Sequence, residues 1–134
     1  EENFKNKPGI IETEVGYAGG LSDKVTYEEV CRGDTGHAEV VRITFDEKII
    51  SFKKILDLFF KMHDPTQKDM QYPDVGTQYR SEIFYEDDIQ KAEAKEILEI
   101  FNKKLNGRVQ TNISQIKNYC KAEDYHQKYL EKNR

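Results

Sequence analysis

The sequence predicts an α+β fold, a single domain in which a mixed or antiparallel sheet carries flanking helices. Two segments alternate apolar and polar side chains with the period of a half-buried strand, and two others carry apolar stripes with helical spacing. No internal repeat, low-complexity segment or linker separates them. A chain of 134 residues buries about two-thirds of the surface that its unfolded form exposes, which is enough for one core. We therefore expect residues 1–134 to form one domain.

The clearest strand patterns lie in the first third of the chain. Alternation over residues 11–17 predicts a strand that Gly19-Gly20 ends, and the pattern returns over residues 39–45. In the second segment Glu39 begins the apolar face, so a carboxylate leads a row of hydrophobic side chains. Further strands are expected over residues 80–85 and 109–116.

Helices are predicted where apolar stripes meet capping residues. Ser51 is a plausible N-cap for a helix that ends before Pro65, and Asp87 and Asp88 open a second helix that Gly107 closes. The stripes are Phe52, Ile55, Leu56, Phe59 and Met62 in the first helix, and Ala94, Ile97, Leu98, Phe101 and Leu105 in the second. A short helical turn after Thr26, a long loop over residues 67–78 and a terminal helix over residues 122–131 complete the expected elements.

Composition excludes several classes of function. The 21 Lys and Arg residues against 25 Asp and Glu give a net charge of −4 without a long block of either sign, so neither nucleic acid nor an anionic membrane is an expected partner. No apolar run approaches the roughly 18 to 20 residues that span a bilayer. Two cysteines and three scattered histidines predict neither a disulfide framework nor a metal site. We expect a cytoplasmic monomer in a reducing compartment.

Glu39 and four tyrosines are the first candidates for chemistry. Glu39 is either a carboxylic acid kept partly protonated by desolvation, as a general acid requires, or a strand-end carboxylate in water. Tyrosines beside glycines or in loops either donate hydroxyl hydrogen bonds to a polar substrate or pack at a rim. These tyrosines are Tyr17, Tyr27, Tyr72 and Tyr79.

His63-Asp64 and the two cysteines also leave alternatives open. His63 and Asp64 form either a functional pair or the stop and turn that follow a helix. Cys31, beside Arg32, is either a thiolate activated by a nearby cation or a small packed residue, and Cys120 between lysines presents the same choice. Pattern alone therefore indicates an acid-and-tyrosine site without a reaction.

Six ordered motifs resemble those of the peptide methionine sulfoxide reductase A family. The resemblance runs over essentially the whole chain, in the family's order and with close to its usual spacings. The motifs are Gly16-Tyr17-Ala18-Gly19-Gly20, Thr26-Tyr27-Glu28-Glu29-Val30-Cys31, Thr35-Gly36-His37-Ala38-Glu39-Val40-Val41, His63-Asp64-Pro65-Thr66, Asp74-Val75-Gly76-Thr77-Gln78-Tyr79-Arg80-Ser81 and Ala122-Glu123-Asp124-Tyr125-His126-Gln127.

The resemblance implies a methionine sulfoxide reductase A-like fold with a ferredoxin-like core, and reduction of methionine S-sulfoxide, free or in proteins, which repairs oxidised proteins. A cysteine or selenocysteine would attack sulfur, become a sulfenic acid and be regenerated by a thiol, finally thioredoxin, without a cofactor. By the same resemblance Glu39 protonates the sulfoxide oxygen, Tyr27 and Tyr79 donate hydrogen bonds to it, and Asp74 supports them through water. Donors aimed at developing charge are strong catalytic devices.

The chain also departs from the family pattern. The family's Gly-Cys-Phe-Trp-Gly motif, which supplies the nucleophile, is absent from the 134 residues. The Gly-rich tail with a resolving cysteine that many members carry is also absent from them. Tyr72-Pro73 stands where the family often has Gly-Asn. We expect a chain that is N-terminally incomplete, with its nucleophile upstream of Glu1. The alternatives are an inactive module that binds sulfoxide or peptide, and an enzyme that uses Cys31; Cys120 is a candidate resolving thiol.

Overall fold

A computed structural model of the chain describes residues 4, 6–21, 25–33 and 35–122, with the backbone alone of Tyr27 and Cys31. The described residues form two compact units. The first unit comprises Glu1–Ile50 and Lys117–Arg134, and the second comprises Ser51–Ile116. The first unit is built around one three-stranded sheet, the second holds two two-stranded sheets, and each unit has its own apolar cluster.

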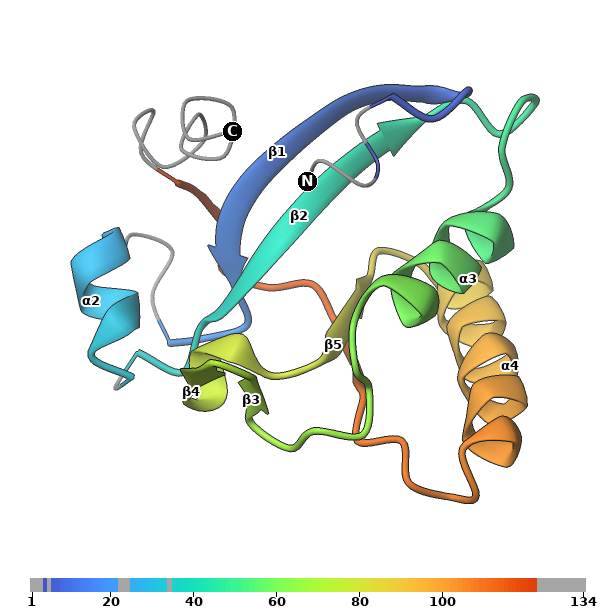
Figure 1. Cartoon of the computed structure of the whole chain (residues 1–134). Helices are drawn as coiled ribbons and strands as arrows, with labels where there is room; N and C mark the ends of the chain where they lie inside the picture. Colours follow the sequence, from blue (N-terminus) through green and yellow to red (C-terminus); the bar gives the residue numbers. More distant parts are fainter. Residues whose placement is uncertain (1–3, 5, 22–24, 34, 123–134) are drawn as a thin grey trace. The chain divides into compact units, whose positions relative to one another are not determined.

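A long antiparallel ribbon dominates the first unit (Figure 1). Strand β1 (Ile10–Ala18) pairs with β2 (Ala38–Phe45), and the short β7 (Cys120–Lys121) adds to the other edge of β1 in the order β2-β1-β7. Both neighbours run antiparallel to β1. The strands predicted over residues 11–17 and 39–45 are therefore confirmed, whereas β7 carries only two residues and no alternation that the sequence could reveal.

Helix α2 (Tyr27–Cys31) follows β1 and begins as the sequence predicts. Thr26 is its N-cap: the Thr26 hydroxyl accepts from the Glu29 backbone N–H at 3.2 Å, and the Glu29 carboxylate accepts from the Thr26 N–H at 3.1 Å. This reciprocal capping box satisfies donors that a helix start leaves open. The same helix contributes Val30 to the apolar cluster, which also holds Val15, Tyr17, Val25 and Ala122.

Two helices form most of the second unit. Helix α3 (Phe52–Met62) is capped by the Ser51 hydroxyl and α4 (Asp88–Lys104) by the Asp87 carboxylate, as predicted. The two helices contact each other, with Phe60 and Phe101 stacked at 4.9 Å between ring centroids. Phe60 is almost fully buried although the predicted stripe contained Phe59 instead, which packs at the edge of the cluster.

The remaining elements of the second unit connect and flank these helices. Strand β5 (Glu82–Tyr85) pairs in parallel with β6 (Asn112–Gln115), confirming two predicted strands in shorter form. The predicted loop over residues 67–78 instead contains a two-stranded hairpin of β3 (Met70–Gln71) and β4 (Asp74–Val75), followed by the 3-10 helix η1 (Thr77–Tyr79). Its strands are too short to give a periodic pattern.

These elements confirm the α+β class with antiparallel and parallel strand pairs and helices beside them. The assignment of residues 1–134 to one domain stays a prediction. The terminal helix expected over residues 122–131 lies almost wholly outside the described residues. Among the described residues, no helix has the length and apolar character needed to cross a membrane.

Candidate active site

The four predicted site residues are divided between the two units. Tyr27 starts α2 and Glu39 is the second residue of β2, both in the first unit. Asp74 starts β4 and Tyr79 ends η1, both in the second unit. Glu39 is exposed, which matches the strand-end alternative better than the buried one. Its catalytic role stays a prediction.

Glu39 lies where β2 enters the sheet, opposite a buried tyrosine. Its backbone partner on β1 is Tyr17, whose side chain is fully buried, and Tyr17 in turn pairs with Cys120 on β7. Tyr17 is therefore a core residue, contrary to both alternatives that the sequence left open, because the strand turns its ring into the apolar cluster. The preceding Ala38 is also completely buried. A packed pair of strands thus fixes the backbone that carries the Glu39 carboxylate.

A polar cluster of Gly20, Thr35, His37 and Asn118 holds the start of β2. The Leu21 N–H donates to the Thr35 carbonyl at 3.2 Å, and the His37 N–H donates to the Thr35 hydroxyl at 3.2 Å. The Asn118 amide donates to the Gly20 carbonyl at 2.7 Å. These bonds join the end of β1, the approach to β2 and the segment before β7.

His37 lies at the centre of this cluster, with 1 % of its surface exposed. Its Nε2 contacts the Asn118 carbonyl oxygen at 3.1 Å, and because a carbonyl only accepts, Nε2 carries the proton. Nδ1 is buried, faces Gly20 and has no hydrogen-bond partner among the described residues. A Cβ at position 20 would lie 2.0 Å from Nδ1 and 2.4 Å from the Thr35 carbonyl oxygen, so only glycine leaves room for the ring.

A second polar cluster covers the middle of the ribbon. The Tyr119 hydroxyl donates a short hydrogen bond to Glu14, and the Arg42 guanidinium lies 5.7 Å from the centroid of the Tyr119 ring. Burial of the hydroxyl group raises the pKa of Tyr119 above its ordinary value, and the nearby Glu14 carboxylate raises it further by a smaller amount. Gly16 lies beneath this ring: a Cβ there would be 2.6 Å from it. The Tyr119 ring therefore rests directly on β1, next to the residue that pairs with Cys120.

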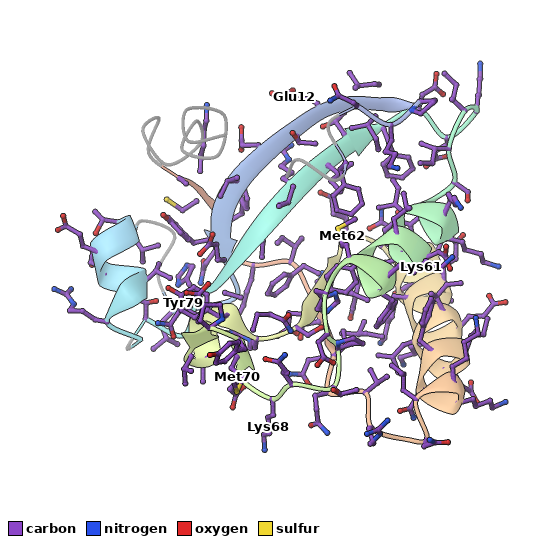
Figure 2. The ribbon with its side chains drawn as sticks, viewed as in Figure 1. Glu12, Lys61, Met62, Lys68, Met70 and Tyr79 are labelled. Carbon is purple, nitrogen blue, oxygen red and sulfur yellow. The ribbon has the colours of Figure 1, made fainter. Side chains whose placement is uncertain are left out.

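In the second unit a hairpin and a 3-10 turn carry Asp74 and Tyr79. Asp74 pairs with Gln71 across the hairpin, and β3 contacts η1. The Gly76 N–H donates to the Asp69 carbonyl at 2.9 Å, and the Tyr79 N–H donates to the Gly76 carbonyl at 3.0 Å. Figure 2 labels Tyr79 on η1, with its side chain half-buried, and Met70 on β3. Asp74 and Tyr79 thus lie five positions apart within one hydrogen-bonded segment.

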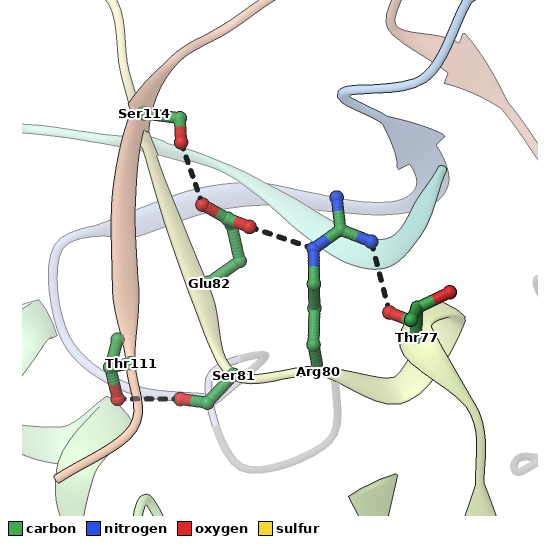
Figure 3. Close-up of polar contacts among 6 residues, drawn as sticks. All are labelled: Thr77, Arg80, Ser81, Glu82, Thr111 and Ser114. Atoms are coloured by element: carbon green, nitrogen blue, oxygen red, sulfur yellow. Dashed lines mark hydrogen bonds and ion pairs between the residues drawn. The ribbon is translucent and has the colours of Figure 1, made fainter. Parts of the chain in front are cut away.

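Arg80 and Glu82 anchor this segment to the parallel strands (Figure 3). The Arg80 Nε donates to the Glu82 carboxylate at 2.8 Å, and its Nη1 donates to the Thr77 carbonyl at 2.9 Å. The Ser114 hydroxyl of β6 donates to the other Glu82 oxygen at 2.8 Å. The side chains of Arg80 and Glu82 expose only 15 % and 5 %, so this ion pair is protected from water and restrains the turn that ends at Tyr79.

A chain of hydroxyl groups extends from His63 to the residues that precede β5 and β6; Figure 3 shows its Ser81–Thr111 part. His63 Nδ1 donates to the Phe59 carbonyl at 2.6 Å, and Nε2 lies 2.7 Å from the Ser81 hydroxyl, which is 2.7 Å from the Thr111 hydroxyl. Ser81 and Thr111 are both buried. Burial lowers the pKa of His63, which favours the neutral ring and a chain running from Thr111 through Ser81 to Nε2.

Of the two alternatives for His63 and Asp64, the structure supports the helix stop and turn, since His63 is the C-cap of α3 and the two side chains bond to other groups. The Asp64 carboxylate instead accepts from the Thr66 hydroxyl at 2.5 Å and the Thr66 N–H at 2.9 Å, and Gln67 donates to its other oxygen at 3.2 Å. These bonds hold the pKa of Asp64 below its ordinary value. His63 turns toward Ser81 instead.

Cys120 is half-buried against the first unit's apolar cluster. Its Sγ lies 3.5 Å from the Val25 carbonyl oxygen and 3.7 Å from that of Lys121, so the thiol donates to the backbone. The described residues contain no group of three or more His, Cys, Asp or Glu side chains that could hold a metal ion.

Sequence reasoning missed the residues that support the four candidates. His37 and Ser81 lie inside motifs that carried the resemblance, yet no role for them followed from pattern. Asn118 adopts the left-handed conformation at φ 51°, which asparagine tolerates better than most residues, and this is the one signal that the residue itself offered. The contacts of Thr111 and Tyr119 span 30 and 105 positions, which short-range patterns cannot reveal.

Comparisons with known proteins identify a family. A family model described as peptide methionine sulfoxide reductase matches residues 1–134. A Pelagibacter ubique protein named peptide methionine sulfoxide reductase MsrA is 58 % identical over 132 residues, which cover 98 % of this chain and 90 % of that protein.

Solved structures give the same result. The structure of methionine sulfoxide reductase A of Corynebacterium diphtheriae matches with a TM-score of 0.93 and 39 % identity, covering 99 % of this chain and 68 % of that one. Mxr1 from Saccharomyces cerevisiae in complex with Trx2 matches with a TM-score of 0.62 and 27 % identity, covering 90 % of this chain and 67 % of that one. The fold class implied by the resemblance is therefore confirmed.

Proposed function

Because the chain belongs to the peptide methionine sulfoxide reductase family, we propose that it is a peptide-methionine (S)-S-oxide reductase, which returns methionine S-sulfoxide, free or in proteins, to methionine. The observation that carries this proposal is the family match over residues 1–134, which includes Tyr27, Glu39, Asp74 and Tyr79. Methionine oxidation is a common lesion that disrupts apolar cores, and its reversal is a repair reaction.

The proposed reaction transfers the sulfoxide oxygen to an enzyme thiolate. The thiolate sulfur attacks the substrate sulfur, and the sulfoxide oxygen takes a proton from the Glu39 carboxyl group. The resulting hydroxyl group then leaves the substrate sulfur and bonds to the enzyme sulfur, while the sulfur–sulfur bond breaks and its electron pair returns to the substrate sulfur. The products are methionine, reduced by two electrons, and an enzyme sulfenic acid, oxidised by two electrons. A neutral carboxyl aimed at the oxygen speeds this step because an unprotonated sulfoxide oxygen is a poor leaving group.

Tyr27, Tyr79 and Asp74 stabilise the charge that grows on oxygen. Phenolic O–H groups held in place before the reaction need no reorganisation when the charge appears. The bonds that tie Tyr79 to Gly76, and Arg80 to Glu82, support such preorganisation in the second unit. Asp74 acts through water, in keeping with its exposure. Since Glu39 is exposed, we propose that the bound substrate itself desolvates the carboxyl group.

We propose that the nucleophile is a cysteine or selenocysteine of a Gly-(Cys or Sec)-Phe-Trp-Gly segment preceding Glu1, and not Cys31 or Cys120. The contacts of Cys120 support this, because its thiol donates to the Val25 carbonyl and packs against the first unit's apolar cluster, as a small structural residue does. An external thiol, ultimately thioredoxin in the cytoplasm, would reduce the sulfenic acid without a cofactor. The yeast Mxr1 complex with Trx2 supports a thioredoxin as that reductant.

The test is Glu39→Gln in the full-length protein, with methionine S-sulfoxide blocked at its amino group as substrate. We expect the single-turnover rate at neutral pH to fall about a hundredfold, because glutamine keeps the size of the side chain but cannot donate the acid proton. Binding should change less. Glu12→Gln is the matched control: Glu12 is an exposed carboxylate of the same ribbon, but it pairs with Thr44, near the other end from Glu39 (Figure 2).

Three outcomes would contradict parts of this proposal. A wild-type single-turnover rate in Glu39→Gln would remove the acid role of Glu39. Loss of the single-turnover reduction in Cys31→Ser or Cys120→Ser, with the fold retained, would make that cysteine the nucleophile. A full-length protein that binds the sulfoxide without reducing either epimer would instead support a binding module of the same fold.

A further inference from the structure

The chain contains two methionines, and one of them joins the two strands of the β3–β4 hairpin. The hairpin has two cross-strand pairs, Met70 with Val75 and Gln71 with Asp74. Neighbouring residues of a strand point to opposite faces, so Met70 and Val75 share one face and Gln71 lies on the other. The pair of Met70 with Val75 is therefore the apolar contact between the two strands.

The face of the hairpin that carries Met70 is directed to solvent. Gln71, on the opposite face, binds the backbone of Asp64 through both ends of its amide: Nε2 donates to the carbonyl at 2.6 Å, and Oε1 accepts from the N–H at 3.2 Å. Val75 exposes 69 % of its surface, and its cross-strand partner Met70 is half-buried. The Met70 side chain is therefore partly accessible to a small oxidant in the folded protein.

The hairpin is short enough for one side chain to affect its closure. Each strand has two residues, and hairpins of this size are marginally stable by themselves. At the base of the hairpin the Gly76 N–H donates to the Asp69 carbonyl at 2.9 Å, and Asp69 adopts φ 53°, a conformation that residues other than glycine adopt infrequently. Oxidation of Met70 would convert its thioether into a polar sulfoxide and so weaken the contact with Val75.

We propose that Met70 is a site of reversible oxidation: hydrogen peroxide forms the sulfoxide, the hairpin then opens more readily, and a second copy of the enzyme returns the S epimer to methionine. The inference rests on the proposed function, because the return step is the reaction proposed there. A second copy is the expected reductant because the face that carries Met70 is directed to solvent, where another molecule can meet it.

Both steps are two-electron reactions of sulfur. In the oxidation the Met70 sulfur bonds to one peroxide oxygen and loses two electrons, while the O–O bond breaks and water leaves. In the return step the oxygen passes to the thiolate of the second copy, which becomes a sulfenic acid. A dithiol then reduces the sulfenic acid to the thiol and releases water as it is itself oxidised to a disulfide.

The test uses full-length protein whose thiols are blocked with N-ethylmaleimide before hydrogen peroxide is added and then removed with catalase. Complete digestion with trypsin places the two methionines in different peptides, residues 62–68 and 69–80, so mass spectrometry reads each sulfoxide separately. We expect Met70 to gain one oxygen. A catalytic amount of unblocked protein with dithiothreitol should then remove about half of the Met70 sulfoxide, because a reductase of this kind acts on one epimer. Dithiothreitol alone should remove none.

Limited digestion with trypsin measures the opening of the hairpin. Lys68 is exposed and lies two residues before Met70 (Figure 2). Oxidation of the blocked protein should speed cleavage after Lys68 about threefold, because it weakens one cross-strand pair. Met70→Leu keeps an apolar side chain without sulfur, so its cleavage should match that of the unoxidised protein before and after peroxide. Met62→Leu removes the other methionine, at the end of α3, and should respond as the wild type does.

Three results would overturn the inference: a Met70 that stays unoxidised, a Met70 sulfoxide that the added copy leaves unchanged, and cleavage after Lys68 that oxidation does not alter. Repair of Met70 only within an unblocked protein, at a rate independent of its concentration, would also overturn it. Reduction of N-blocked methionine S-sulfoxide by the same unblocked protein is the control for the proposed function. If that compound is reduced and the Met70 sulfoxide is not, only this inference fails, whereas failure on the compound itself refutes the proposed function.

Discussion

The two units support their predicted site residues in different ways. In the first unit the approach to Glu39 depends on close packing: the His37 ring lies against Gly20, and no residue that the structure describes bonds its Nδ1. In the second unit the approach to Tyr79 depends on satisfied polar groups, with both nitrogens of His63 bonded and hydroxyl groups continuing the chain. Close packing and one ring hydrogen bond thus hold the buried His37 in the first unit, whereas hydrogen bonds at both ring nitrogens hold the half-buried His63 in the second.

This difference predicts which kind of substitution each unit tolerates. Overpacking a closely fitted site forces backbone or ring to move, whereas removing one member of a buried polar chain leaves its neighbours unpaired. The first unit should therefore be sensitive to added volume at Gly20. The second unit should be sensitive to lost hydroxyl groups at Ser81 and Thr111.

The largest effect is expected for Gly20→Ala. The new Cβ would meet His37 Nδ1 at 2.0 Å and the Thr35 carbonyl oxygen at 2.4 Å, and the second of these is backbone that cannot easily yield. We expect the free energy of unfolding in urea to fall by about 3 kcal/mol. In a His37→Ala background the same change should cost less, because the ring contacts are gone.

Gly36→Ala separates crowding from backbone conformation. Gly36 adopts φ +76°, and a Cβ there would meet nothing closer than 3.5 Å. Alanine at this position would therefore destabilise the protein only through its unfavourable backbone conformation. We expect a loss of about 1 kcal/mol in the same urea measurement. Equal losses at the two glycines would show that packing against His37 is unimportant, contrary to the comparison above.

Ser81→Ala should be the most damaging loss of a hydroxyl in the second unit. It removes both side-chain hydrogen bonds of Ser81 and so deprives the half-buried His63 Nε2 and the buried Thr111 hydroxyl of this partner. We expect about 2 kcal/mol of destabilisation in urea. Thr111→Val keeps the shape of the side chain but removes the last hydroxyl group of this hydrogen-bond chain, and it should lower the free energy of unfolding by about 1 kcal/mol. A Ser81→Ala protein as stable as wild type would mean that this chain contributes nothing.

Capping residues and apolar periodicity predicted the longer helices and strands. The features that they did not predict depend on contacts between residues far apart in the sequence. The caps at Thr26, Ser51 and Asp87 were visible because each lies within three residues of the N–H group that it accepts from. The hairpin inside the predicted loop was invisible because two-residue strands have no period. Tyr17 was assigned to a rim or a site because its burial depends on distant partners.

The candidate site shows the same limit. The resemblance supplied Tyr27, Glu39, Asp74 and Tyr79, yet residue patterns alone gave Glu39 two alternatives and no reaction. His37 depends on Asn118, 81 positions away, so no local pattern predicts its burial. Burial and bonding of this kind arise from tertiary packing, which a single sequence does not display.

Thr26→Ala tests a local stabilising device in the first unit. The substitution removes the hydroxyl that accepts from the Glu29 N–H and so breaks the capping box of α2. Because α2 has five residues and is also fixed by Val30 in the apolar cluster, we expect a loss of about 1 kcal/mol or less in urea. Thr26→Ser keeps the cap and should be nearly neutral. A loss well above that of Gly36→Ala would mean that the cap, and not Val30, holds the helix.

The smallest effect is expected in the pH dependence of stability, and it distinguishes the two histidine environments most directly. Burial lowers the pKa of His63 in the folded protein below its ordinary value of 6.5, so the unfolded chain binds a proton more readily than the folded one. The contribution of neutral His63 is therefore present above pH 6.5 and is lost as the pH falls through 6.5 toward the lower folded value. Asp64, whose pKa is also lowered, has an ordinary value of 3.8 and affects stability only in a more acidic range. Urea unfolding at pH 7.5, 6.5 and 5.5 should thus show a decline that is shallower in His63→Gln, although that variant is less stable at pH 7.5 because it loses a hydrogen bond. The other histidines are common to both proteins and cancel in the difference. An identical slope in both proteins would mean that the bonds to Phe59 and Ser81 hold His63 equally well in either protonation state.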